Sequence, residues 1–388
     1  MTVLIAPDKF KGSLDTFELC KAMAAGVQEA DASINTLLLP LADGGDGFAK
    51  VMGHYLNTVT ISQQTVDAVG KPIEAAYEWS AKTQTAVIEL AVASGIALLN
   101  NSELNPLKAS TYGTGLLVKA AIQKGAKKII IGLGGSATND GGMGLLAAIG
   151  YRFLDAQQNE LTPCGASLEK VTQIVAPEYL IETTFVIACD VTNPLLGKNG
   201  TAHTYAAQKG ATDQEIILLE NGMQNFGTLL EKTTSKSIID QPGSGAAGGT
   251  CAGLLLLPNA TIQKGMDIVL EYSHFKQHLF KASLLITGEG AFDQQTLNGK
   301  VVYAVATLAK ASGVPAIAIC GKVDADAAAI KECGLAYITS ICNRPMTFEE
   351  SKKDAYNLVQ QATANIIYLL DLFDNSFQIN ISVVKCSN

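Results

Sequence analysis

Arginine is almost absent from this chain of 388 residues, because only Arg152 and Arg344 occur among its 28 basic residues. The planar, two-pronged binding of carboxylate or phosphate that arginine provides must come from these two, or be replaced by lysines and backbone amides. Charged residues make up only 16% of the chain, and the formal net charge is −8. A broad basic surface for nucleic acid is therefore not expected.

Paired cysteines and long apolar segments are also missing. The eight cysteines are scattered and form no Cys-x-x-Cys pair, which is typical of reduced, buried thiols rather than of a disulfide framework or a zinc site. No basic segment followed by an apolar one opens the chain, and the longest apolar run, residues 252–258, is far too short to cross a membrane. These absences predict a cytoplasmic protein that has no membrane partner.

Three common signatures of nucleotide and acyl chemistry are absent as well. The chain has no Gly-x-x-x-x-Gly-Lys-Ser/Thr, so a P-loop nucleoside triphosphatase is unsupported. No Gly-x-Gly-x-x-Gly follows the first predicted strand, which argues against a dinucleotide-binding fold. A Gly-x-Ser-x-Gly with a convincing triad context is missing too, which argues against a serine hydrolase.

What the chain does contain is typical of a large α/β enzyme. Hydrophobic residues make up 48% of the sequence, which also has 36 glycines. Strand and helix patterns alternate at both ends, which predicts a parallel sheet. An alternating stretch over residues 58–89 predicts an antiparallel meander. We therefore expect a discontinuous parallel α/β domain, residues 1–58 plus 262–388, with a second α/β domain inserted at 59–261.

The most informative stretch is a glycine-rich turn over residues 132–144. It follows an apolar run, Ile129–Ile131, and leads into a predicted helix, an arrangement that points backbone N–H groups toward an anion. Hydroxyl, amide and carboxylate side chains share the turn and suit a phosphorylated or polyhydroxy ligand. The candidate binding residues are Gly134, Gly135, Ser136, Thr138, Asn139 and Asp140. A tight strand-to-helix turn without a ligand is the alternative interpretation.

Other polar turns follow predicted strands, where parallel sheets bind their ligands. Four candidate groups of this kind occur along the chain: Asp8 with Lys9; Asp43 with Asp46; Gly288, Glu289 and Gly290 with Asp293; and Lys322 after Gly321. Lys300, at the start of a predicted helix, is placed to reach a phosphate. Each group also has a local interpretation, because aspartate and glycine are common turn residues.

Asp190 ends a buried apolar run and opens the segment that contains Asn193. A carboxylate in such surroundings is a candidate general base or metal ligand, because burial and neighbouring charges tune its proton affinity. An Asx turn before Pro194 is the local alternative. A second glycine-rich turn, residues 243–249 with Gly245 near its centre, either holds an anion or permits close helix packing.

Together these motifs resemble the type I glycerate kinase family. The matching segments occur in the family's order and span about residues 1–370. They are residues 5–8, 42–47, 134–142, 188–195, 208–211, 243–249 and 287–290, with Asp293. The resemblance implies phosphorylation of D-glycerate that depends on ATP and Mg²⁺, in glyoxylate or sugar-acid breakdown. It also implies a flavodoxin-like domain with an inserted α/β domain and an active-site cleft between the two.

Residue roles follow from the resemblance as hypotheses. Asp190 is the leading candidate for the base that takes the proton of the glycerate hydroxyl. Asp293 either binds Mg²⁺ or shares the base role, and Asp190 is the other candidate Mg²⁺ ligand. Lys9 and Lys300 are expected to neutralise phosphate or carboxylate charge. The family includes enzymes that make the 2-phosphate and others that make the 3-phosphate; we favour 2-phosphoglycerate.

The chain departs from the family pattern at two positions. Ala291 replaces a frequent arginine and Leu116 a frequent glutamate. The first change keeps open a non-catalytic sugar-acid sensor on the same fold. A GHMP-type small-molecule kinase is a further alternative, because residues 132–137 are similar to the phosphate loop of that class. The tail after Phe373 has no family counterpart, and the oligomeric state stays open.

Overall fold

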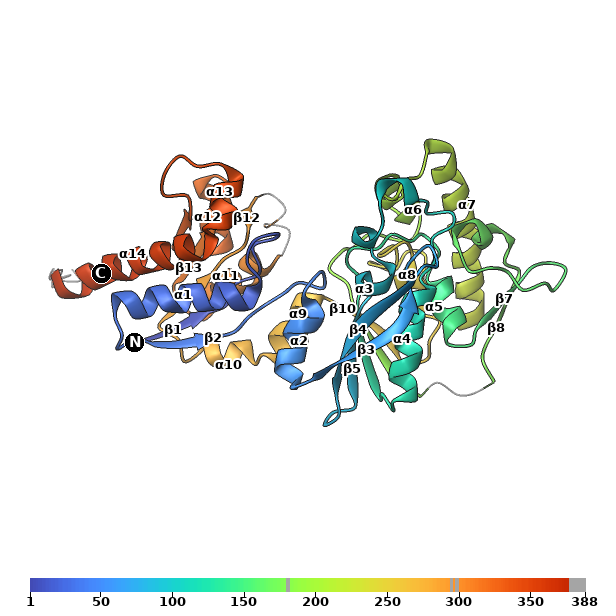
Figure 1. Cartoon of the computed structure of the whole chain (residues 1–388), viewed down its shortest axis with the longest axis horizontal. Coiled ribbons are helices and arrows are strands. Elements are labelled where there is room, and N and C mark those ends of the chain that lie inside the picture. Colours follow the sequence, from blue (N-terminus) through green and yellow to red (C-terminus); the bar gives the residue numbers. More distant parts are fainter. Residues whose placement is uncertain (179–181, 294–295, 297–299, 377–388) are drawn as a thin grey trace, which may run out of the picture. The chain divides into compact units, whose positions relative to one another are not determined.

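The two ends of the chain meet in one sheet of five parallel strands (Figure 1). The structure is a computed structural model that describes residues 1–178, 182–293, 296 and 300–376. Contacts divide the chain into unit 1, Met1–Ala42 with Ser273–Asn388, and unit 2, Asp43–Tyr272. These boundaries differ from the expected 58 and 262. The reason is that helix α2 (Phe48–Leu56) contacts the second sheet and helix α9 (Gly265–Tyr272).

The sheet of unit 1 has the order β15-β13-β11-β1-β2. Its strands are β1 (Thr2–Ile5), β2 (Asn35–Leu38), β11 (Leu284–Thr287), β13 (Ala316–Cys320) and β15 (Tyr337–Ser340). All neighbours are parallel. Numbered within the unit, this is the 2-1-3-4-5 order of flavodoxin-like sheets. The expected α/β class is confirmed.

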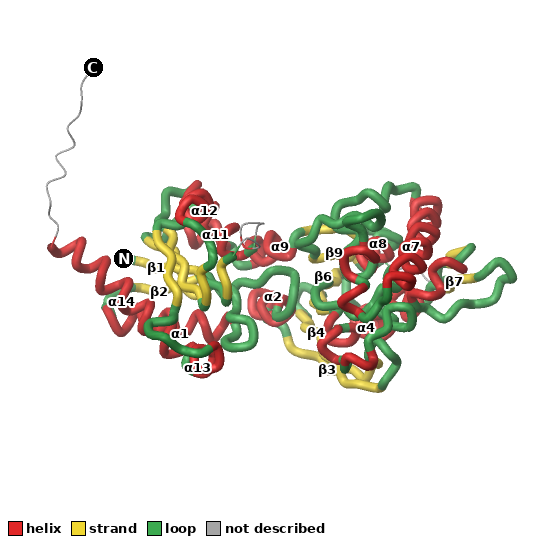
Figure 2. The backbone as a smooth tube through the Cα atoms, turned by 90° about the horizontal axis from the view of Figure 1, so that it is seen from above, coloured by secondary structure: helices red, strands yellow, loops and turns green. Residues whose placement is uncertain are grey.

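Helices cover both faces of this sheet (Figure 2). Helix α1 (Thr16–Ala30) and helix α14 (Ala355–Ser376) pack against each other and share an apolar core with the strands. Helix α11 (Val301–Ala311) contacts β11 and β13. The central strands are apolar throughout because both of their faces are buried. The remaining helices of the unit are α10 (Phe275–Leu279), α12 (Ala327–Cys333) and α13 (Phe348–Lys353), and two short strands, β12 (Ala291–Phe292) and β14 (Lys322–Val323), pair in parallel.

Two sequence expectations for unit 1 need correction. The apolar run within residues 35–40 predicts a buried strand, but β2 is an edge strand, and Leu38 is 41% exposed. The sequence over residues 348–370 predicts one long helix, but the structure has two, which break at Asp354, where φ is −101° and ψ is 10° and the helical backbone geometry ends. The last expected feature, the tail, lies from residue 377 on outside the described residues.

Unit 2 contains a mixed sheet of six strands in the order β10-β9-β6-β5-β4-β3. Strands β3 (Val59–Val66), β4 (Pro72–Ser80) and β5 (Thr85–Glu89) form an antiparallel meander where alternation predicts one. Strands β6 (Lys128–Gly132), β9 (Thr184–Ala188) and β10 (Ala260–Gln263) continue from β5 in parallel. The parallel half therefore presents the carboxyl ends of its strands at one edge.

Five further helices of unit 2 build one large apolar core on the sheet. They are α3 (Ala91–Ser94), α4 (Tyr112–Gln123), α5 (Met143–Ala148), α7 (Asp213–Thr234) and α8 (Thr250–Leu254). Helix α6 (Thr201–Tyr205) belongs to a smaller apolar cluster, and a small hairpin pairs β7 (Arg152–Leu154) with β8 (Gln173–Val175). Within the described part of the chain, no helix is both long and apolar enough to span a membrane.

Candidate functional site

The glycine-rich turn connects β6 to α5 in unit 2. Gly135, Gly141 and Gly142 have φ values of +70°, +62° and +76°, in the left-handed region that glycine adopts without strain. Gly134 lies so close to the Asp43–Asp46 turn that an added Cβ would be 2.7 Å from Gly45 Cα. Both observations explain why this turn requires glycine, and they place it against a second polar turn.

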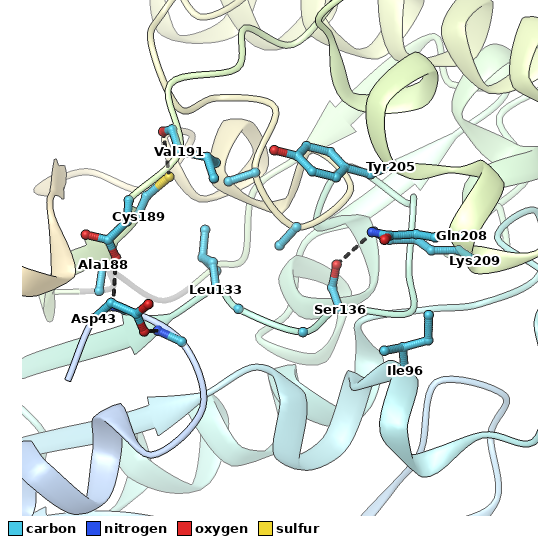
Figure 3. A pocket seen from close by; sticks show the side chains of 17 residues that line it. Asp43, Ile96, Leu133, Ser136, Ala188, Cys189, Val191, Tyr205, Gln208 and Lys209 are labelled. Atoms are coloured by element: carbon cyan, nitrogen blue, oxygen red, sulfur yellow. Dashed lines mark hydrogen bonds between the residues drawn. The ribbon is translucent and has the colours of Figure 1, made fainter. Parts of the chain in front are cut away.

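These turns line a pocket of about 380 Å³ (Figure 3). Its walls follow the carboxyl ends of the parallel strands β6 and β9, the position at which α/β sheets bind ligands. Apolar side chains make up much of the lining, and polar and charged groups lie among them. The lining residues are Asp43, Gly44, Gly45, Ile96, Leu133, Gly134, Gly135, Ser136, Ala188, Cys189, Asp190, Val191, Tyr205, Gln208, Lys209, Ala246 and Ala247.

Asp190 follows β9 and is held by backbone N–H groups. The Gly44 N–H donates to its Oδ2 (2.7 Å), and the Met266 N–H donates to its Oδ1 (3.4 Å). Protein atoms around the carboxylate desolvate it and raise its pKa, and repulsion from Asp43 acts in the same direction, although the N–H donors oppose both. A carboxylate with raised proton affinity beside a pocket can act as a general base.

Lys209 is a pocket residue that the sequence-based prediction missed. It lies in a short 3₁₀ turn, Ala207–Lys209, and is only 2% exposed. Its Nζ donates to Ser136 Oγ (2.8 Å) and to the Thr138 carbonyl (2.7 Å). Burial lowers the pKa of Lys209 to about 7. The available signal was the Gln208–Ala211 segment, which contributed to the family resemblance without a role for its lysine.

Three predicted binding residues of the turn lie behind the pocket lining rather than in it. Asp140 is fully buried and accepts from Thr111 N–H (2.8 Å), Thr111 Oγ1 (2.8 Å), Gly142 N–H (3.1 Å) and Gly144 N–H (3.1 Å). Thr138 and Asn139 are also fully buried. Among the described residues, neither the Thr138 hydroxyl nor the Asn139 side-chain amide has a hydrogen-bond partner.

Other predicted residues of unit 2 support the pocket walls. Asp43 lines the pocket and accepts from the Gly45 N–H (3.0 Å). Asn193 accepts from the Tyr205 hydroxyl (2.7 Å), and its carbonyl accepts from the Gly245 N–H (3.1 Å). An added Cβ at Gly245 would be 2.2 Å from the Pro194 carbonyl, so this glycine serves close packing. Asp46 is exposed and lies outside the lining.

Unit 1 brings a second group of predicted residues together where β1 and β11 end. The Asp8 N–H donates to the Gly288 carbonyl (2.9 Å), and the Lys9 N–H donates to Asp8 Oδ1 (2.7 Å). Glu289 is 5% exposed, and its Oε1 accepts from the Thr296 hydroxyl (2.6 Å). Strand β1 lies between β2 and β11, at the switch point of the flavodoxin-like order, where such sheets bind ligands.

The charges in this group act on one another. Burial raises the pKa of Glu289 to about 7, and repulsion from Asp8 and Asp293 adds to it, whereas Thr296 and Lys300 oppose the rise. The Asp293 carboxylate also accepts from the Thr296 N–H (3.3 Å). Gly290 continues the turn, with Lys11 N 3.3 Å from the position of an added Cβ.

The described residues contain no preformed metal-binding site made of three or more His, Cys, Asp or Glu side chains. The two predicted Mg²⁺ ligands belong to different units, Asp190 to unit 2 and Asp293 to unit 1. Magnesium usually binds through one or two carboxylates together with water and substrate phosphates. Glu289 carries oxygen donors of this type, as do Asp8 and Asp293, whose charges both act on Glu289.

We expect Glu289 to make stability depend on pH. Its folded-state pKa is raised to about 7, so between about pH 4.5 and pH 7 the folded protein binds more protons than the unfolded chain. The free energy of unfolding should therefore fall as pH rises through this window, and Glu289→Gln should flatten the decrease. Urea unfolding at several pH values measures it. Glu332→Gln, at an exposed glutamate of α12, is the control; equal slopes in the two variants would contradict the expectation.

Comparisons with known proteins agree on one family. The model of the glycerate kinase family matches residues 3–371. The chain is 37% identical over 369 residues to the glycerate kinase of Halalkalibacterium halodurans, covering 94% of this chain and 97% of that relative. It is 35% identical over 370 residues to the glycerate 2-kinase of Escherichia coli K12, with shares of 94% and 97%. A crystal structure of a Salmonella typhimurium LT2 protein assigned as glycerate kinase 2 matches with a TM-score of 0.86 and 36% identity, covering 96% of this chain and 99% of the other.

Proposed function

Because the chain belongs to the glycerate kinase family and is a kinase, we propose that it transfers the γ-phosphoryl group of ATP to D-glycerate. The proposed product is 2-phosphoglycerate, and the name of the Escherichia coli relative, glycerate 2-kinase, supports this choice. A role in glyoxylate or sugar-acid breakdown and a cytoplasmic location stay predictions.

The observation that carries the proposal is the position of Asp190 in the wall of a small pocket that polar and apolar groups line together. Phosphoryl transfer needs an aligned hydroxyl nucleophile and screening of charge more than it needs covalent chemistry. Asp190 would accept the proton of the glycerate hydroxyl as that oxygen attacks phosphorus. The Gly44 N–H, 2.7 Å from Oδ2, fixes the orientation of the carboxylate. Desolvation raises its pKa and makes it a better proton acceptor at neutral pH.

The glycine-rich turn would hold the acceptor substrate in this pocket. Gly134 and Gly135 bring backbone close to the cavity, and Ser136 places a hydroxyl there. Such groups suit the hydroxyl and carboxylate oxygens of a three-carbon hydroxy acid. Asp140 would act indirectly, because its carboxylate holds the turn through Gly142 and Gly144.

Unit 1 would hold the nucleotide and its metal ion. Asp293, with Glu289 and Asp8 beside it, supplies the carboxylate oxygens that Mg²⁺ prefers. When bound, Mg²⁺ would neutralise charge on the phosphates. Lys9 and Lys300 would add positive charge near the same turn. A cavity of about 530 Å³ next to Gly290 has both apolar walls and the lysines Lys11, Lys322 and Lys352, which suits a base together with phosphates.

The direct test is release of ADP by the purified protein in the presence of MgATP and D-glycerate. We expect ADP release that depends on glycerate. Release at the rate seen without glycerate, while glycerate still binds, would instead support the sensor that Ala291 suggests. Parallel reactions in which other small hydroxy acids replace D-glycerate would show, from the rates of ADP release, how selective the pocket is.

A further inference from the structure

Lys209 is a buried lysine at the pocket wall, where burial disfavours the charged ammonium form. Asp140 is the carboxylate whose charge acts favourably on it. The Asp140 oxygens, however, already accept four hydrogen bonds from Thr111, Gly142 and Gly144. Burying an unpaired ammonium is costly, so such a lysine either loses its proton or meets an anion.

The hydrogen bonds of Lys209 fit an amine that is neutral in the free protein and becomes charged when an anion binds. A neutral amine has two N–H donors, and Nζ uses two, toward Ser136 Oγ (2.8 Å) and the Thr138 carbonyl (2.7 Å). An ammonium has three donors. The third has no acceptor among the described residues, although Lys209 lines the cavity (Figure 3). Protonation therefore provides one donor and one positive charge for a ligand in the pocket.

We propose that Lys209 is the anion-binding residue of this pocket, and that its ammonium group binds the carboxylate of the hydroxy-acid substrate. The inference rests on the proposed function, because glycerate is the anion in question. It also assigns a coupling: glycerate binding draws one proton from solvent onto the Lys209 amine. The proton forms the third N–H bond, and the carboxylate accepts it as a hydrogen bond.

Other titratable groups also lie at the pocket or next to it. Asp43 and Asp190 come from two loops, Cys189 from the end of β9, Tyr205 from α6, and Asp140 from behind the turn. Burial holds the pKa of free Lys209 at about 7. A bound carboxylate raises that pKa, so proton uptake should be largest above pH 7 and small below it.

Calorimetric titration of the full chain with D-glycerate tests the inference. Titrations at about pH 8 in buffers of different ionisation enthalpy give the number of protons taken up per glycerate bound. Wild-type protein should take up close to one. Lys209→Met should take up close to none and should bind glycerate about 10-fold to 100-fold more weakly. Lys209→Arg keeps the positive charge, so it should bind glycerate more tightly than Lys209→Met does. It should take up no proton, because arginine is already protonated.

Lys236→Met is the matched control. Lys236 belongs to the same unit, and its Nζ donates to the Leu255 backbone carbonyl (3.1 Å), but it does not line the pocket. It should bind glycerate like the wild type and take up the same proton. A merely structural Lys209 would leave proton uptake at zero in the wild type, which overturns the inference even if Lys209→Met fails to fold.

The outcomes separate the two hypotheses. Wild-type binding with proton uptake that Lys209→Met abolishes supports the inference. Wild-type binding that Lys209→Met leaves unchanged overturns the inference but not the proposed function. If the wild type binds no glycerate under any of these conditions, both are overturned.

Discussion

Replacing Asp190 with asparagine is expected to lower kcat for glycerate phosphorylation by about 10²-fold to 10⁴-fold, the range of general-base catalysis. Asparagine keeps an oxygen that can accept from the Gly44 N–H, so the local fold should persist. It cannot take a proton from the substrate hydroxyl. Steady-state kinetics with varied glycerate should therefore show a change mainly in kcat, with a smaller change in KM.

Two further variants sharpen the Asp190 experiment. An added Cβ at Gly44 would be 2.5 Å from Asp190 Oδ2. The Gly44→Ala variant keeps the Asp190 carboxylate but should displace it, and kcat should therefore fall. Asp155→Asn is the matched control, because Asp155 also accepts backbone N–H groups in unit 2 but does not line the pocket. Near-normal turnover by Asp190→Asn would remove Asp190 from the base role.

Replacing Asp140 with alanine is expected to cost about 3–5 kcal/mol in the free energy of unfolding, the usual result of breaking a buried charged network. The change leaves the N–H groups of Thr111, Gly142 and Gly144 without their acceptor in a fully buried place. Urea unfolding monitored by circular dichroism measures the loss. Activity should fall as well, because these bonds hold the glycine-rich turn that lines the pocket.

Asp155→Ala provides the control for this prediction. Asp155 accepts from two backbone N–H groups, those of Gln157 and Asn159 at 2.8 Å, but its turn is exposed. Water can replace its carboxylate, so we expect a cost of about 1 kcal/mol or less. Equal losses for the two alanine variants would show that Asp140 does not hold the turn as described.

The sequence predicts the position of the pocket well because its signals are local. Glycines that need positive φ and a carboxylate after a buried strand can both be recognised along the chain, and Gly135, Gly142 and Asp190 are such cases. The flavodoxin-like fold of unit 1 was instead predicted from the family resemblance. The apolar runs at both ends indicate only a parallel sheet.

The residues that were misjudged depend on packing between distant segments. Lys209 becomes a buried pocket residue only because the turn after α6 lies on Ser136 and Thr138, about 70 positions earlier in the chain. Asp140 was expected to bind substrate or nucleotide, but Thr111 from the start of α4 occupies its carboxylate. No local pattern distinguishes a turn carboxylate that faces a ligand from one that faces the next helix.

The most direct test of the central claim is the ³¹P NMR spectrum of the product formed from MgATP and D-glycerate. The account predicts a new phosphate ester signal split into a doublet by the single hydrogen on C2, as in 2-phosphoglycerate. A triplet from the two hydrogens on C3 would contradict the proposed site of transfer. A spectrum with no ester signal, recorded with protein shown to be folded, would contradict glycerate phosphorylation itself.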